Sequence, residues 1–172
     1  NNFFRCSNQP AAELAARLCE VTPERFQHVF FTNSGSEAND TQIKFVHRYF
    51  DLLGKPDKKL IISRRNAYHG STIGASSLGG MSAMHKQTIG LDYVHHIQQP
   101  HWFEEGADLD PQAFGIAAAR ELEKKIDELG EDRVAAFIAE PVQGAGGVIV
   151  PPETYWPEVK RTLDERDILL IS

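Results

Sequence analysis

Apolar and polar positions along the chain predict helices and strands that alternate. Residues 10–20 and 37–53 carry apolar side chains three and four positions apart, as one face of a helix does. The same spacing predicts helices over residues 111–129 and 153–165. Short apolar runs predict strands over residues 29–32, 60–63, 93–97, 134–139 and 168–171. This alternation is typical of an α/β fold, a mainly parallel sheet with helices on both faces.

Two segments interrupt the alternation. Residues 70–90 are rich in Gly and Ser and predict loops with a short helix, whereas residues 98–112 are polar, contain Pro100 and Pro111, and predict a surface excursion. The chain starts without a methionine and stops directly after the last predicted strand. We therefore expect residues 1–172 to be an internal piece of a larger α/β protein.

Composition excludes several functional classes. The 172 residues are 41% hydrophobic, enough for one globular domain, and the net charge of −6 without a basic stripe argues against a nucleic-acid partner. No apolar run is long enough to cross a membrane, and no signal peptide is recognisable. Cys6 and Cys19 lack the CxxC spacing of zinc sites and do not form a disulfide framework, so we expect a reduced, cytoplasmic setting.

A first polar cluster follows the predicted strand over residues 29–32. Ser34, Gly35 and Ser36 stand at the start of the next helix, and Glu37 lies three residues after Ser34, as in a capping box. Free N–H groups, hydroxyls and the positive end of the helix dipole bind anions, most often phosphate. The cluster predicts either a phosphate site or simply a capped turn.

Two further clusters follow the strands over residues 60–63 and 134–139, and ligands of such sheets collect at the carboxyl ends of the strands. Tyr68-His69-Gly70 places an aromatic ring, which can stack on a planar ligand, beside a possible acid–base group. Glu140 directly follows a buried strand, where a carboxylate is costly unless it is paired. Structural hydrogen bonds within the loops are the alternative for both His69 and Glu140.

Other motifs are weak or missing. His95, His96 and His101 lack the i, i+4 spacing of a helical metal site. The glycines over residues 144–147 lack the GxGxxG spacing of a dinucleotide turn, which argues against an NAD-type oxidoreductase. The chain also has no Walker A loop and no GxSxG nucleophile elbow.

Taken in order, Ser34-Gly35-Ser36-Glu37-Ala38-Asn39, Tyr68-His69-Gly70 and Ala139-Glu140-Pro141-Val142-Gln143-Gly144 resemble the large domain of the class III aminotransferases. These are pyridoxal-phosphate enzymes of fold type I, and the chain is most similar to the omega-aminotransferases that use pyruvate as amino acceptor. The resemblance covers essentially the whole chain. It implies a transaminase that moves an amino group from an amine or amino acid to a keto acid and is a homodimer when complete.

The resemblance also implies roles for six residues. Gly35 and Ser36 bind the cofactor phosphate through backbone N–H groups and the Ser36 hydroxyl, and Ser34 shapes the turn. The Tyr68 ring stacks on the pyridine ring, and His69 lies near the ring and the substrate. Glu140 belongs to the network near the phenolic oxygen of the cofactor, or pairs with an arginine in members that handle dicarboxylates.

Parts of the family pattern are missing from residues 1–172. The aspartate that pairs with the pyridine nitrogen, the lysine that binds the cofactor covalently and the small domain are expected after Ser172, so no catalytic lysine is assigned here. A phosphate-contacting threonine comes from the partner subunit in this family. The sixth and seventh strands, which separate the first strand from the fifth, are absent too. We therefore expect residues 1–172 alone to be poorly stable, with unpaired strand edges.

Two alternatives stay open at this point. The chain could be a non-catalytic module that binds a phosphorylated ligand, which an Asp and a later Lys beyond Ser172 would argue against. Mutase and decarboxylase chemistry also occur on this scaffold, so the resemblance alone does not decide the reaction.

Overall fold

The computed structural model describes residues 7–87, 89–106 and 108–172. They form two compact units, one up to Asn33 and one from Ser34 to Ser172. Among these residues, no helix is long and apolar enough to cross a membrane. Cys19 is a free thiol, and Cys6 lies outside the described residues.

The first unit contains helix α1 (Gln9–Val21), which Asn8 caps by accepting a hydrogen bond from the N–H of Ala11. The predicted strand over residues 29–32 is wrong, because these residues have an irregular backbone. An apolar run becomes a strand only beside a neighbour that pairs with its N–H and C=O groups. The strands of the described sheet all belong to the second unit and pair with one another, so an apolar pattern alone was not sufficient here.

The second unit is built on a parallel sheet of four described strands, in the order β2-β1-β3-β4. Their bounds are Leu60–Arg64 for β1, Val94–Ile97 for β2, Val134–Ile138 for β3 and Leu169–Ile171 for β4. The four strands predicted over this part of the chain are therefore confirmed. Because all are parallel, the loops that follow β1 and β3, which are neighbours, leave from the same edge of the sheet.

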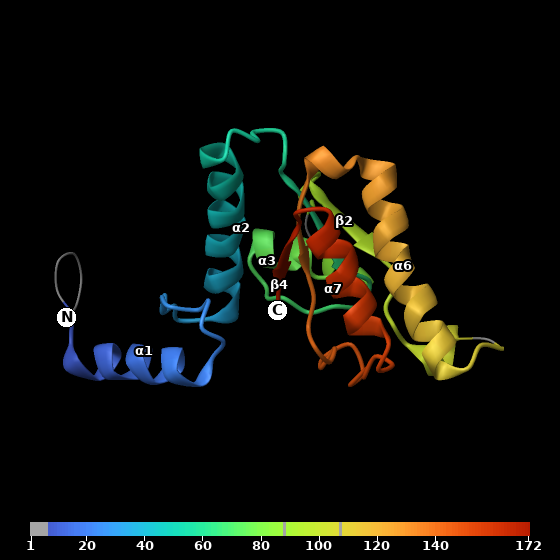
Figure 1. Cartoon of the computed structure of the whole chain (residues 1–172), viewed down its shortest axis with the longest axis horizontal. Coiled ribbons are helices and arrows are strands. Elements are labelled where there is room, and N and C mark those ends of the chain that lie inside the picture. The colour runs from blue at the N-terminus through green and yellow to red at the C-terminus, as the bar shows by residue number, and fades with distance from the viewer. Residues whose placement is uncertain (1–6, 88, 107) are drawn as a thin grey trace. The chain divides into compact units, whose positions relative to one another are not determined.

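Helices cover both faces of this sheet, as predicted (Figure 1). Helices α6 (Pro111–Leu129) and α7 (Tyr155–Glu165) pack on one face, and α2 (Gly35–Leu52) and α3 (Ile73–Leu78) on the other. Neighbouring residues of β1 divide between the two cores, since Ile62 faces α6 and α7 whereas Ile61 faces α2. Each such side chain stabilises the fold by about 1.5–3 kcal/mol.

Short elements occupy the two segments that lack helical or strand patterns. The Gly- and Ser-rich segment contains α3 and α4 (Ser82–His85), and the polar segment contains α5 (Trp102–Glu105). A 3-10 turn, η1 (Glu131–Arg133), leads into β3.

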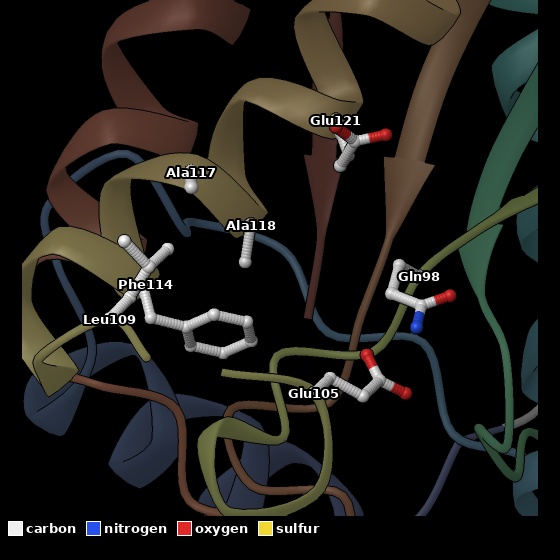
Figure 2. A pocket seen from close by; sticks show the side chains of 7 residues that line it. All are labelled: Gln98, Glu105, Leu109, Phe114, Ala117, Ala118 and Glu121. Carbon is white, nitrogen blue, oxygen red and sulfur yellow. The ribbon is translucent and has the colours of Figure 1, made fainter. Parts of the chain in front are cut away.

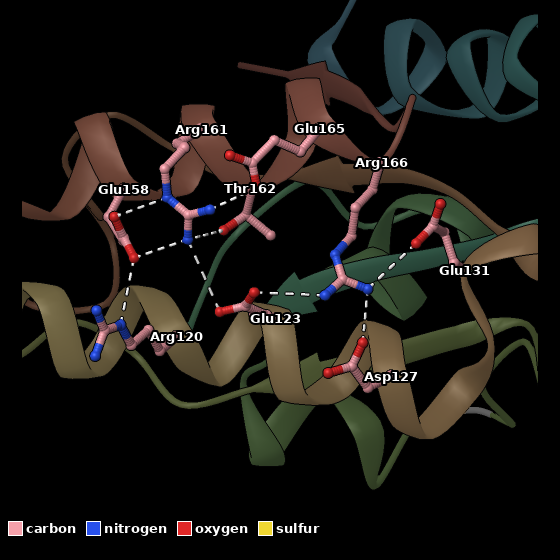
Figure 3. A network of polar contacts seen from close by, with 9 residues as sticks. All are labelled: Arg120, Glu123, Asp127, Glu131, Glu158, Arg161, Thr162, Glu165 and Arg166. Carbon is pink, nitrogen blue, oxygen red and sulfur yellow. Dashed lines mark hydrogen bonds and ion pairs between the residues drawn. The ribbon is translucent and has the colours of Figure 1, made fainter.

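An ion-pair network joins the exposed sides of α6 and α7 (Figure 3). Arg166 lies 2.6 Å from Asp127, 3.4 Å from Glu123 and 3.3 Å from Glu131. Arg161 lies 2.9 Å from Glu158 and 2.5 Å from Glu165. Arg166 and the pair of Arg161 with Glu123, at 3.8 Å, connect α7 and its end to α6.

Candidate functional site

The three sequence clusters converge at the carboxyl edge of the sheet. The loop after β1 lies against the start of α2, because a Cβ on Gly70 would lie only 2.4 Å from the Ser36 hydroxyl oxygen. Gly70 has a φ of +132°, which side chains rarely adopt, so glycine is required here twice over. The Ser36 oxygen accepts a hydrogen bond of 3.0 Å from the N–H of Ser71.

The N-terminus of α2 has the geometry of an anion site. Ser34 caps the helix, its hydroxyl accepting from the N–H of Glu37 at 3.2 Å, which confirms the predicted cap. Gly35 is exposed, and a Cβ placed there would meet no atom within 4 Å. The first N–H groups of a helix have no partner within it. Since the Ser36 oxygen accepts from Ser71, its own proton is directed elsewhere and can donate to a ligand.

Two further hydrogen bonds lock the loop onto α2. The Asn39 amide donates to the carbonyl of His69 at 2.6 Å, and the Thr72 hydroxyl donates to Asp40 at 3.0 Å. Asp40 and Thr72 were not recognised in the sequence. Thr72 was recognisable only as a possible cap of a short helix, since it caps α3 by accepting from the N–H of Ala75.

Glu140 joins this loop to the loop after β3. One carboxylate oxygen accepts from the N–H of Tyr68 and the other from the N–H of Gly144, both at 3.0 Å. A carboxylate that accepts two backbone N–H bonds is held firmly in one orientation. The Tyr68 side chain, 44% exposed, leaves its ring open to a ligand.

His69 is a partly buried imidazole, and its surroundings favour the neutral form. Burial lowers its pKa to about 4; nearby Arg64 and His96 lower it further, whereas Glu140 opposes the shift. Its Nε2 is buried and has no hydrogen-bond partner among the described residues. At pH 7 this side chain can donate or accept a hydrogen bond, but it carries no charge.

The loop after β3 is fixed to the loop after β1 by polar side chains. Asn66, at a φ of 60°, donates to the carbonyl of Gly146 at 2.6 Å. Gln143 is fully buried, and its amide donates to the carbonyl of Arg65 at 3.2 Å. A Cβ on Gly146 would lie 2.4 Å from the Asn66 carbonyl oxygen, so these glycines serve close packing of two loops.

Comparisons with known proteins identify the family of the chain. The class-III aminotransferase family profile matches residues 2–172. The chain belongs to the class III aminotransferase family.

Relatives agree with this assignment. The chain is 54% identical over 173 residues to a putrescine–pyruvate aminotransferase of Pseudomonas aeruginosa, and 44% identical to a chloroplastic gamma-aminobutyrate transaminase of Solanum lycopersicum. Both alignments cover 100% of the chain, but 38% and 34% of those relatives. The chain thus spans little more than a third of the length of the curated relatives it matches.

Solved structures show the same fold. An (S)-enantioselective omega-transaminase from Thermomicrobium roseum superposes with a TM-score of 0.94 at 41% identity, over 98% of this chain and 38% of that one. A transaminase with L-alanine superposes with a TM-score of 0.92 at 43% identity, over 99% and 41%. The predicted fold class, a large domain of fold type I with its parallel sheet, is confirmed.

His85 and His96 lie side by side, with ring centres 5.2 Å apart, whereas His101 contacts a different part of the chain. His96 donates through its Nε2–H to the carbonyl of Gly79 at 2.8 Å, and His101 lies 3.1 Å from Glu104. Within residues 7–87, 89–106 and 108–172, no three His, Cys, Asp or Glu side chains are placed to hold a metal ion.

A cavity of about 320 Å³ lies beside α6 and contains none of the predicted site residues (Figure 2). Its apolar floor is Phe114 and Ala118, and Glu105 and Glu121 lie at its rim. Gln99 donates to one oxygen of Glu105 at 3.1 Å and Lys124 to Glu121 at 2.6 Å, whereas the other oxygen of Glu105 is buried without a hydrogen-bond partner among the described residues. The cluster around Ser36, Tyr68 and Glu140 is the candidate that we retain, because it brings a helix N-terminus, an aromatic ring and an oriented carboxylate together.

Proposed function

We propose that residues 1–172 are part of the pyridoxal-phosphate-binding large domain of a longer transaminase. That enzyme moves an amino group from an amine or omega-amino acid to a keto acid such as pyruvate. Family membership and the name of the Pseudomonas relative, a putrescine–pyruvate aminotransferase, support this reaction. We also propose a cytoplasmic homodimer, without nucleic-acid or membrane partners; some plant relatives are named chloroplastic or mitochondrial.

The observation that carries the proposal is the open helix start at Gly35, with Ser36 held by the loop of Gly70. The N–H groups of Gly35 and Ser36 and the Ser36 hydroxyl would bind the phosphate, and Ser34 keeps the turn in shape. A phosphate dianion suits this place, because both the N–H groups and the helix dipole favour negative charge.

The other predicted residues fit the ring of the cofactor. Tyr68 would stack on it, and neutral His69 would contribute a hydrogen bond without adding charge. Glu140, held by two N–H groups, would fix the orientation of the polar network beside the ring. When bound, pyridoxal phosphate supplies the electron sink for breaking bonds at the amino-bearing carbon. We propose that the lysine for its covalent attachment lies outside this chain.

Absorbance spectroscopy of the longer protein tests the proposed reaction. We expect added pyridoxal phosphate to give a protein-bound absorbance band that an amine donor bleaches and pyruvate restores. Binding without a response to any amine donor would instead support a non-catalytic module for a phosphorylated ligand. No binding would refute both.

Two serine variants test the phosphate site. Ser36→Ala removes a donor to a charged group and should weaken pyridoxal phosphate about tenfold or more in a fluorescence titration. Ser34→Ala is the matched control: it removes the cap, lowers stability by about 1 kcal/mol, and should affect affinity less. Equal affinity in wild type and Ser36→Ala would contradict the assignment.

A further inference from the structure

Arg64 is a buried cation directly behind the proposed site. It ends β1, and its side chain is fully buried. Among the described residues it forms no ion pair with a carboxylate, and its Nε and Nη1 groups have no hydrogen-bond partner. Burial lowers its pKa, an effect that Tyr155 and Glu140 oppose. Burying a cation with so few partners lowers the stability of the folded protein, which indicates that Arg64 has a role other than stabilisation.

The Arg64 guanidinium contacts the backbone of the site. The Nη2 group of Arg64 donates to the carbonyl of Glu140. The next carbonyl, that of Pro141, accepts from the indole N–H of Trp156 at 3.3 Å. Two consecutive carbonyls at the end of β3 are thus held from the α7 side, while the Glu140 carboxylate is held from the other loops.

Arg64 and Trp156 also hold each other. The guanidinium carbon lies 5.6 Å from the centre of the Trp156 ring and 5.9 Å from that of Tyr155. Cation–π attraction at this range is favourable when the cation is desolvated. The planar guanidinium can face these rings and donate to the carbonyl at the same time, which a lysine ammonium cannot do as well.

Arg64 and Glu140 act with opposite charge on the same region. Glu140 is the carboxylate that acts on both Arg64 and His69, and Arg64 acts on His69 with the opposite sign. With Arg64 present, the anion at Glu140 is offset by a fixed cation in a region of low dielectric. Without it, the site would carry one uncompensated negative charge.

We propose that Arg64 is the positioning residue of Glu140: it fixes the backbone on which the carboxylate stands and offsets its charge beside the cofactor. This inference rests on the proposed function. A group bound near an uncompensated anion holds its proton to higher pH, so the pH at which the bound cofactor changes its absorbance reports the charge balance.

The test uses the longer protein loaded with pyridoxal phosphate, with Arg64→Met as the main variant. We expect the midpoint of the absorbance titration to rise by at least about half a pH unit, from Coulomb interaction at short range. Arg64→Lys should restore at least half of this shift. Arg65→Met, an exposed neighbour with the same change in charge, should leave the midpoint unchanged.

The double variant Arg64→Met/Glu140→Gln separates charge balance from a merely structural role. Because both charges are removed, its midpoint should return toward that of the wild type. If Arg64→Met does not fold, Glu140→Gln alone decides, since losing only the anion must lower the midpoint.

An unchanged midpoint in folded Arg64→Met, or no return in the double variant, overturns the inference; so does an unchanged midpoint in Glu140→Gln. Wild-type protein that does not bind pyridoxal phosphate refutes the proposed function instead.

Discussion

Arg64 at the carboxyl edge of the sheet and Arg166 on the outer side of α7 have opposite surroundings. Arg166 is partly exposed and meets three carboxylates within 3.4 Å (Figure 3). Arg64 is fully buried and donates to a backbone carbonyl, with Nε and Nη1 unpartnered among the described residues. The partly exposed Arg166 has several charged partners although water can also reach it, whereas the buried Arg64 has few partners although water is excluded.

This difference in pairing indicates which polar groups stabilise the fold and which can bind a ligand. Around Arg64, the Nε2 of His69 and the Oε1 of Gln143 are also buried without a partner. Unsatisfied buried polar atoms cost roughly 1–3 kcal/mol each, so a cluster of them is expected where a ligand binds. The α6–α7 network satisfies its members internally and needs no ligand.

The largest effect is expected from Gly70→Ala, which disrupts the contact between the loop after β1 and the start of α2. Gly70→Ala places a Cβ 2.4 Å from the Ser36 oxygen and at a strained φ, so the loop must move away from α2. We expect pyridoxal phosphate to bind at least about 100-fold more weakly, close to 3 kcal/mol, in an equilibrium titration of the longer protein.

Gly54→Ala is the control for this variant. Gly54 also has a positive φ, of +71°, but a Cβ there would meet nothing within 4 Å. It should lower stability by about 1 kcal/mol and leave cofactor affinity unchanged. Wild-type affinity in Gly70→Ala would contradict the proposed contact between the loop and the phosphate site.

A smaller effect follows from the neutral His69. Its folded-state pKa of about 4 lies below the ordinary 6.5, so between these values the unfolded chain binds a proton that the folded chain does not. Stability therefore falls as the pH falls through this window, by up to about 3 kcal/mol near pH 4. In His69→Gln, the melting temperature should depend less on pH between 6.5 and 4.5. The same substitution at exposed His28 should keep the wild-type slope, and equal slopes in all three proteins would refute this account.

The smallest effect is expected at the ion-pair network. Arg166→Met changes charge and size as Arg64→Met does, but at a partly exposed place. We expect a loss of no more than about 1 kcal/mol in stability, which shrinks in high salt, and unchanged cofactor affinity. Loss of affinity here would show that the two regions are not as separate as their contacts suggest.

Sequence patterns predicted the strands and the polar clusters better than the contacts between distant parts of the chain. The apolar runs of β1 and β3 are buried on both faces, so their signal depends little on neighbours. Residues 29–32 have the same kind of pattern but are not a strand, because pairing depends on a partner that a local pattern does not contain.

Site residues also differ in whether a local pattern or a distant contact defines them. Ser34 was recognisable because a helix cap is local, and its predicted bond to the N–H of Glu37 is present. The sequence predicts a solvated pair at Arg64-Arg65, which is wrong for Arg64, because its side chain is fully buried. Its surroundings depend on Glu140 and Trp156, which are 76 and 92 residues away along the chain. The roles assigned to Ser36, Tyr68, His69 and Glu140 toward a cofactor remain predictions.

The most direct test of the central claim is an experimental structure of the longer protein with pyridoxal phosphate. We expect the phosphate within hydrogen-bond distance of the Gly35 N–H and the Ser36 hydroxyl, with the Tyr68 ring over the pyridine. A phosphate bound elsewhere, with the start of α2 occupied only by water, would contradict the claim.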